Sequence, residues 1–129
     1  MSLVKDITQN TSFVPEDMPL NEVAILVADS GAGVVGVTRD GRAVGTVTKD
    51  VLEARVLALG RDISSLKAKH VMEHRPITIE WLSDDSDLID TAILMRRNRT
   101  SNAIVIRGGL PVGVVSYGAL SRYNLGDLA

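Results

Sequence analysis

The sequence contains no cysteine, and this absence excludes several kinds of site at the outset. Without a thiol the chain cannot form a disulfide framework, a thiolate nucleophile or a cysteine-ligated zinc site. A reducing compartment is compatible with this composition. The chain also opens without the basic segment and apolar run of a signal peptide, so we expect a cytoplasmic protein.

Long apolar runs and an excess of basic charge are missing as well. No uninterrupted apolar stretch approaches the roughly 18–20 residues needed to cross a bilayer, so no membrane span is predicted. The net charge is −2, from 14 Lys and Arg against 16 Asp and Glu. Since phosphate neutralisation needs clustered basic residues, nucleic acid is not the expected partner. Hydrophobic residues make up 45% of the 129 residues, which is enough to form a core.

Two parts of the chain are similar to each other at a fixed spacing. Residues 45–48 (GTVT) align with residues 113–116 (GVVS), an offset of 113 − 45 = 68. The same offset pairs Leu20 with Leu88, Ala24 with Ala92, Leu52 with Leu120, and Phe13-Val14 with Trp81-Leu82. Nearer the start the offset is 69 − 5 = 64, which pairs Lys5 with Lys69 and Ile7 with Val71. The chain therefore consists of two copies of one unit.

Each copy is predicted to contain a helix, a hairpin and a second helix in that order. Apolar side chains at i, i+3, i+4 and i+7 from Leu20 predict the first helix, and Asp40-Gly41 between two β-rich runs predicts a hairpin. The first copy then has a helix from Leu20 that ends at Gly31 and Gly33, strands over 34–38 and 42–48, and a closing helix over 49–60. The second has a strand over 77–79, a helix over 86–97, strands over 103–106 and 110–116, and a short helix over 117–125.

We therefore predict an α+β or α/β fold of two β-α-β-β-α repeats, residues 1–62 and 63–129, which together form one compact module. A half of about 60 residues buries too little surface to be comfortably stable alone. We expect the two small sheets to pack face to face about a pseudo-twofold, with helices flanking them.

Four short segments point to a known family. The run 70–72 (HVM) followed by 76–78 (PIT) is typical of the start of its repeat, and the segments 45–48 and 113–116 are typical of its end. With these segments in order, the chain resembles a tandem pair of cystathionine-β-synthase-type (CBS) domains, a Bateman module, from about Val4 to Leu125.

The resemblance implies a non-catalytic regulatory module for signal transduction. Such a module binds an adenosine-containing ligand (AMP, ADP, ATP or S-adenosylmethionine) between its repeats, without a metal or a catalytic cofactor. It is expected to form a homodimer and to act on an attached or separate effector protein.

The resemblance also implies two ligand clefts, each built from both repeats. One would combine Thr48, Lys49 and Asp50 with Ile77, Thr78, Asn102 and Ala103. The other would combine Ser116, Tyr117 and Gly118 with Thr8, Thr11, Gly33 and Val34. The hydroxyls of Thr48 and Ser116 would contact phosphate or ribose, and the N–H groups that begin the next helix would favour an anion.

One departure from the family pattern weakens the expectation of a nucleotide. The family places a ribose-binding Asp three residues after the Thr or Ser, where this chain has Val51 and Ala119. Asp50 comes one residue too early, which is about 100° around a helix. Losing a carboxylate that accepts two ribose hydroxyls removes roughly a few kcal/mol of affinity. A protein-interaction or dimerisation module with degenerate ligand sites is therefore the alternative. An enzyme is not expected, because the sequence offers no convergent set of acid, base and nucleophile.

Two motifs match other functions only in part. Residues 31–36 (GAGVVG) fit the dinucleotide-binding pattern, but they follow a predicted helix and open a strand, the reverse of the order that pattern needs. Residues 70–74 (HVMEH) fit a zinc-protease pattern. Pro76 prevents a helix from continuing through that motif, and no third ligand is evident.

A run of basic residues later in the chain has two interpretations. The run 96–99 (RRNR) is typical of a helix C-terminus, where positive charge favours the helix dipole. The second interpretation places Arg99 near a bound phosphate, and His74 and Arg75 at a cleft mouth could meet phosphate in the same way.

Overall fold

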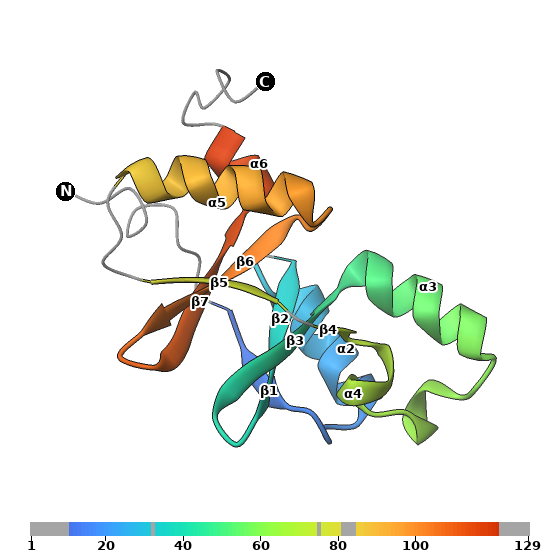
Figure 1. The fold of residues 1–129 in the computed structure, drawn as a ribbon. Coiled ribbons are helices and arrows are strands. Elements are labelled where there is room, and N and C mark those ends of the chain that lie inside the picture. Colours follow the sequence, from blue (N-terminus) through green and yellow to red (C-terminus); the bar gives the residue numbers. More distant parts are fainter. Residues whose placement is uncertain (1–10, 32, 75, 81–84, 122–129) are drawn as a thin grey trace. The chain divides into compact units, whose positions relative to one another are not determined.

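The structure, a computed structural model, describes residues 11–31, 33–74, 76–80 and 85–121. It divides into two compact units, one formed by Thr11–Pro76 and the other containing the described residues from Ile77 onward. Each unit has its own sheet and its own helices (Figure 1). The predicted α+β class, with two small sheets and flanking helices, is confirmed.

The unit Thr11–Pro76 is built on a four-stranded sheet. Its elements are β1 (Phe13–Pro15), α2 (Leu20–Asp29), β2 (Val34–Arg39), β3 (Arg42–Thr48), α3 (Lys49–Leu59), the 3₁₀ turn η1 (Ile63–Ser65), α4 (Ala68–Val71) and β4 (Glu73–His74). The strand order is β1-β2-β3-β4, with β1 parallel to β2 and the other pairs antiparallel.

The second unit repeats most of this order around a three-stranded sheet. Its described elements are β5 (Ile77–Glu80), α5 (Asp85–Arg97), β6 (Asn102–Arg107), β7 (Leu110–Ser116) and α6 (Tyr117–Ser121). The strand order is β5-β6-β7, with β5 parallel to β6 and β6 antiparallel to β7. The part of the predicted last helix beyond Ser121 lies outside the described residues.

The apolar spacing of the first helix is reflected in the core of its unit. Leu20, Val23 and Val27 of α2 are all buried, and they pack in one cluster with apolar residues of the sheet and of α4. That cluster also contains Val14, Val35, Val37, Val47, Leu66, Ala68, Val71 and Met72. The second unit has a smaller core, made of Ala92, Met95, Ala103, Val105, Val115 and Leu120.

The helix α2 ends just before the glycines that predicted its C-terminus. Its last residue is Asp29, and the cap is Ser30 in an extended conformation whose N–H donates to the carbonyl of Val27. Gly31 and Gly33 therefore belong to the connection to β2, where Gly33 takes a φ of +71°.

The two hairpins reproduce the internal repeat in atomic detail. The turn after β2 is made by Asp40 and Gly41, both with positive φ (52° and 79°), as a tight two-residue hairpin requires. The turn after β6 uses Gly108 and Gly109 in the same way (60° and 81°). Each hairpin also has an irregularity at the same place, after Val37 in one and after Val105 in the other, an offset of 105 − 37 = 68.

Strand pairing corrects one part of the sequence alignment. Phe13 pairs with Gly36, and Thr78 pairs with Ile104, which is the equivalent of Gly36 at the offset of 68. Phe13 therefore corresponds to Thr78, at an offset of 78 − 13 = 65. The alignment of Phe13-Val14 with Trp81-Leu82 is wrong, because the difference in loop length falls after the first strand of each copy and not before it.

Candidate functional site

The closing strand of each copy ends beside the start of its partner strand. Thr48, the last residue of β3, pairs with Val34, the first residue of β2. Ser116, the last residue of β7, pairs with Asn102, the first residue of β6. A helix follows each hydroxyl directly, α3 after Thr48 and α6 after Ser116. Each unit therefore presents a hydroxyl at a junction between a strand and a helix.

The Thr48 hydroxyl caps α3. Its Oγ1 accepts the N–H of Val51 at 3.2 Å, which satisfies one of the donors that a helix start leaves unpaired. Because the oxygen serves as the acceptor, the hydroxyl hydrogen can still be donated elsewhere. Lys49 and Asp50 form the first turn of α3, and both are exposed.

Two further hydroxyls converge on the carbonyl of Val34. Ser30 Oγ donates to that oxygen at 3.2 Å, and Thr11 Oγ1 donates to it as well. The two hydroxyl oxygens lie 3.4 Å apart. A carbonyl oxygen has two lone pairs and can accept both of these hydrogen bonds. Because Thr11 donates its only hydroxyl hydrogen here, its oxygen can only accept a hydrogen bond from any other group. The neighbouring Gly33 is exposed.

The second unit gathers its candidate residues around the start of β6. Ile77 pairs with Ala103 across the parallel strands, and Ala103 is fully buried in the core. Asn102 is half-buried and its Nδ2 donates to Ser101 Oγ at 3.1 Å. The N–H of Tyr117 donates to the carbonyl of Ser101 at 2.8 Å.

The remaining candidates of this unit differ in exposure. The Tyr117 side chain is half-buried and packs against the core of its unit. Thr78 and Gly118 are exposed, and Ser116 is half-buried. Thr8 lies outside the described residues.

The structure thus brings predicted site residues together within each unit. Thr48 lies beside Val34 and directly precedes the exposed first turn of α3. In the other unit, Ser116 lies beside Asn102. The predicted clefts combine residues of one unit with residues of the other, and those combinations stay predictions. The boundary of the sequence repeats after residue 62 also stays a prediction; β4, which follows it, pairs with β3 inside the unit Thr11–Pro76.

Comparison with known proteins adds to the structural description. The family model named CBS domain matches residues 4–56 of this chain. No curated protein matches the sequence significantly.

Solved structures of CBS-domain proteins share the fold along nearly the whole chain. A conserved CBS-domain protein of Thermoplasma acidophilum superposes with a TM-score of 0.80 at 19% identity, covering 99% of this chain and 74% of that one. CBSX2, solved in complex with AMP, gives 0.71 at 21% identity and covers 98% of both chains. The CBS domain pair of MJ0100, solved with 5′-methylthioadenosine and S-adenosylmethionine, gives 0.74 at 22% identity and covers 94% of this chain and 98% of that one. The fold is that of a tandem CBS pair.

The two partial motifs lie in structures that fit the CBS fold. Residues 31–36 follow α2 and lead into β2. They therefore do not begin a helix, in agreement with the order predicted from the sequence. His70 belongs to α4 and His74 to β4, and His70 Nδ1 accepts the N–H of Lys67 at 2.9 Å. Within the described ranges, no group of three or more His, Cys, Asp or Glu could hold a metal ion. Among the helices that the structure describes, none is both long and apolar enough to cross a membrane.

The run of basic residues ends α5, as its composition indicated. The helix stops at Arg97, and the N–H of Thr100 closes the end by donating to the carbonyl of Met95 at 3.0 Å. Arg99 has a φ of +53°, a left-handed conformation that glycine usually occupies at helix ends.

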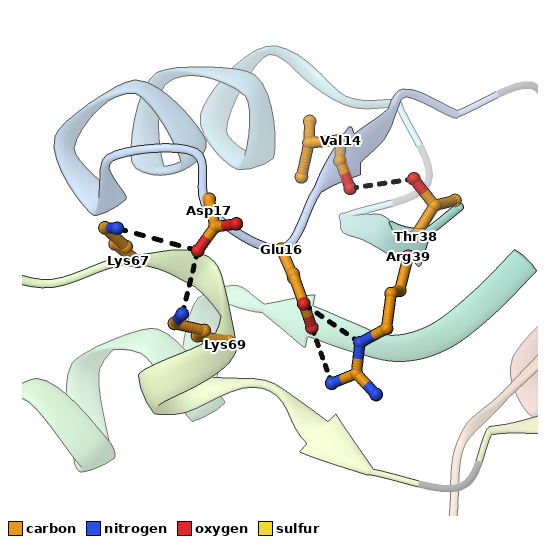
Figure 2. A network of polar contacts seen from close by, with 7 residues as sticks. All are labelled: Val14, Glu16, Asp17, Thr38, Arg39, Lys67 and Lys69. Carbon is orange, nitrogen blue, oxygen red and sulfur yellow. Dashed lines mark hydrogen bonds and ion pairs between the residues drawn. The ribbon is translucent and has the colours of Figure 1, made fainter. Parts of the chain in front are cut away.

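An ion-pair network that the sequence did not indicate lies in the unit Thr11–Pro76 (Figure 2). Glu16 accepts two hydrogen bonds from Arg39, at 2.9 and 2.7 Å. Asp17 lies 2.8 Å from Lys69 Nζ and 3.5 Å from Lys67 Nζ. These residues are up to 52 positions apart in sequence (69 − 17), so no local periodicity reveals the contacts.

Backbone hydrogen bonds reinforce this network. The N–H of Lys69 donates to the carbonyl of Glu16, and the N–H of Ala68 donates to that of Met18, both at 3.0 Å. The N–H of Leu20 donates to the carbonyl of Leu66 at 2.8 Å. The segment that leads into α4 is therefore fixed to the segment that leads into α2.

We expect acid to destabilise the unit Thr11–Pro76. The hydrogen bond from Arg39 lowers the pKa of Glu16, and the hydrogen bond from Lys69 lowers the pKa of Asp17. Because these carboxyls bind protons more readily when unfolded, their stabilisation is present at neutral pH and is lost as pH falls below about 5. Urea unfolding between pH 7 and pH 3 in low salt measures this loss.

A variant without the two carboxylates provides the control. Glu16→Gln with Asp17→Asn should unfold with a smaller dependence on pH in the same range. If the variant and the wild type lose stability in parallel, other carboxyls such as Asp62, whose pKa is lowered by the N–H of Ser64, account for the acid effect.

Proposed function

We propose that this CBS pair is a non-catalytic regulatory module that binds an adenosine-containing ligand and passes its presence to an effector protein. The observation that carries the proposal is the repeated junction, with Thr48 before α3 and Ser116 before α6. Two CBS proteins with this fold were solved with adenosine compounds, AMP in one and 5′-methylthioadenosine with S-adenosylmethionine in the other. A cytoplasmic location is part of the proposal and rests on the lack of cysteine.

The proposed ligand bridges the two repeats. One set of contacts is Thr48, Lys49 and Asp50 with Ile77, Thr78, Asn102 and Ala103, and the other is Ser116, Tyr117 and Gly118 with Thr8, Thr11, Gly33 and Val34. At the first set, the Thr48 hydroxyl donates to phosphate or ribose while it caps α3, and the Lys49 ammonium adds a positive charge for phosphate.

The chemistry of the chain limits how tightly ribose is held. Val51 stands where the family has an Asp, and its N–H is already donated to Thr48. Ala119 stands at the equivalent position in the second repeat. Without a carboxylate for the ribose hydroxyls, we propose that phosphate and adenine contacts contribute most of the affinity. The dissociation constant should then be higher than in family members that have the Asp.

Ligand-dependent stability tests this proposal. AMP, ADP, ATP and S-adenosylmethionine, with and without magnesium, are titrated against the protein in a thermal-shift assay. A ligand that binds only the folded state adds about 2.7 kcal/mol at a hundred times its dissociation constant, which is a shift of several degrees for a chain of this size. Thr48→Ala with Ser116→Ala should raise the dissociation constant of each site about 2- to 12-fold, since each site loses one hydroxyl bond that contributes roughly 0.5–1.5 kcal/mol.

The controls separate binding from helix capping. Thr48→Ala also removes the cap of α3, so each shift is measured against the same variant without ligand. Thr48→Ser with Ser116→Thr keeps both hydroxyls and should bind like the wild type. A double alanine variant that binds every probe as well as the wild type excludes these hydroxyls from the site, and a folded wild type that responds to no probe at millimolar concentration rejects adenosine binding.

Exposed leucines favour a second candidate, a homodimerisation or protein-interaction module. On α3, Leu57 is 83% exposed and Leu59 is 45% exposed, so the last turn of this helix presents two large apolar side chains to solvent. If a second copy covers them, Leu57→Lys should shift sedimentation velocity from dimer to monomer without loss of secondary structure. Leu110→Lys, at a hairpin residue that is 61% exposed, is the matched control and should leave the sedimentation unchanged. A wild-type monomer at about 100 µM would reject the dimer, since an interface of ordinary size binds far more tightly.

A further inference from the structure

The helix α3 is attached to its unit by few contacts. None of its residues is fully buried, and it packs on the core through half-buried side chains, Leu52 and Val56. Among the described residues, Arg55 makes the only side-chain hydrogen bonds that join α3 to another element. The position of α3 therefore depends on two apolar contacts and one guanidinium.

The guanidinium of Arg55 binds the end of α4. Its Nη1 donates to the carbonyl of Met72 at 2.9 Å and to that of Val71 at 3.2 Å. Val71 is the last residue of α4 and Met72 is its C-cap, so these carbonyls are among those that a helix end leaves unpaired. A cation is favourable there, and hydrogen bonds from a charged donor are about twice as strong as neutral ones.

The residues held in this way lead directly to the other unit. Met72 is buried and its side chain lies against Gly45 of β3, while β4 follows at once and the unit ends at Pro76. The short helix α4 has little stability of its own, since it spans only Ala68–Val71. Arg55 therefore fixes the beginning of the segment that connects the two units.

We infer that Arg55 couples the N-terminus of α3 to the connection between the two units, so that a ligand held at Thr48 changes the stability of residues 71–74. The physiological signal in this inference rests on the proposed function, whereas the coupling itself is a property of the free protein. When the cap stabilises the N-terminus of α3, Arg55 keeps its hydrogen bonds to the two carbonyls, and the hydrogen bond that closes α4 stays formed. When the N-terminus of α3 unfolds, the guanidinium loses its hydrogen bonds to the two carbonyls, and the end of α4 unfolds as well.

A double-mutant cycle without ligand tests the coupling. Amide hydrogen exchange is followed at Met72, whose N–H donates to the carbonyl of Ala68 at 3.0 Å and so reports the opening of α4. Thr48→Ala removes the cap of α3 and should speed exchange at Met72 about fivefold, the effect of a typical cap. In an Arg55→Gln background, Thr48→Ala should leave exchange at Met72 unchanged while it still speeds exchange at Val51. Equal acceleration in both backgrounds, or none at Met72 in either, overturns the inference.

A conservative variant and a ligand arm complete the experiment. Arg55→Lys keeps a charged donor and should restore part of the effect, which a loss of general stability would not do; if Arg55→Gln does not fold, this variant carries the cycle. With AMP as the probe, the wild type should gain protection at Val51 and Met72, and Arg55→Gln at Val51 alone. If AMP protects neither amide in the wild type while the cycle shows coupling, AMP binding at Thr48 fails and the inference about Arg55 stands.

Discussion

Replacing Leu20 with alanine is expected to lower the free energy of unfolding by about 2–5 kcal/mol. Leu20 begins α2, is fully buried, and belongs to the core cluster that joins α2 to the sheet and to α4. The substitution removes the apolar surface and leaves a cavity, because close-packed neighbours relax only in part. Urea unfolding followed by circular dichroism measures the change, which corresponds to a fall in Tm of roughly 10 °C or more.

A position on the same helix serves as the control for this prediction. Ile25 is 62% exposed, so Ile25→Ala should change stability by less than about 0.5 kcal/mol. Equal effects at Leu20 and Ile25 would mean that α2 does not carry the core of the unit Thr11–Pro76.

The repeat made most of the secondary structure predictable. Local rules determine where these elements begin and end: apolar spacing places α2, and the Asp40-Gly41 and Gly108-Gly109 pairs place the hairpins because those turns require positive φ. The strand β7 spans Leu110–Ser116 as expected. The glycines likewise indicated the end of α2, which stops at Asp29 with Ser30 as its cap and Gly31 next.

The contacts between distant segments could not be predicted in this way. The ion pairs of Glu16 and Asp17 and the hydrogen bonds of Arg55 to the end of α4 depend on how segments meet in space, and periodicity within one segment carries no information on that. The same limit affects the candidate site. The sequence correctly indicated that Thr48 and Ser116 stand at strand ends before helices, but the chemistry of each hydroxyl, such as the Thr48 cap, required the structure.

The two kinds of function make different demands on α3. A ligand sensor needs its N-terminus, where Thr48 and the exposed first turn lie, whereas an interaction module needs its C-terminal half, where Leu57 is exposed. Both demands fall on the same helix. Ligand-dependent dimerisation would therefore connect the two candidate functions, and loss of that dependence in Arg55→Gln would place Arg55 between them.

Replacing Gly45 with alanine is expected to lower the free energy of unfolding by about 1–3 kcal/mol. A Cβ at this position would lie 2.6 Å from Met72 Sδ and 2.7 Å from the carbonyl oxygen of Glu73. The sulfur can move in part, but the oxygen belongs to the backbone of β4, which pairs with β3 at this residue. The clash therefore separates β4 from the sheet and should also speed amide exchange at Met72.

Gly31→Ala is the matched control for Gly45→Ala. A Cβ at Gly31 meets no atom within 4 Å, and its φ is not in the left-handed region, so the control should be neutral or slightly stabilising. Adding Met72→Ala to Gly45→Ala removes one of the two clashes, so the pair should cost less than the sum of the single variants. Additive costs would show that the contact with Glu73 alone forbids a side chain at Gly45, and a neutral Gly45→Ala would show that β4 does not need this close approach to β3.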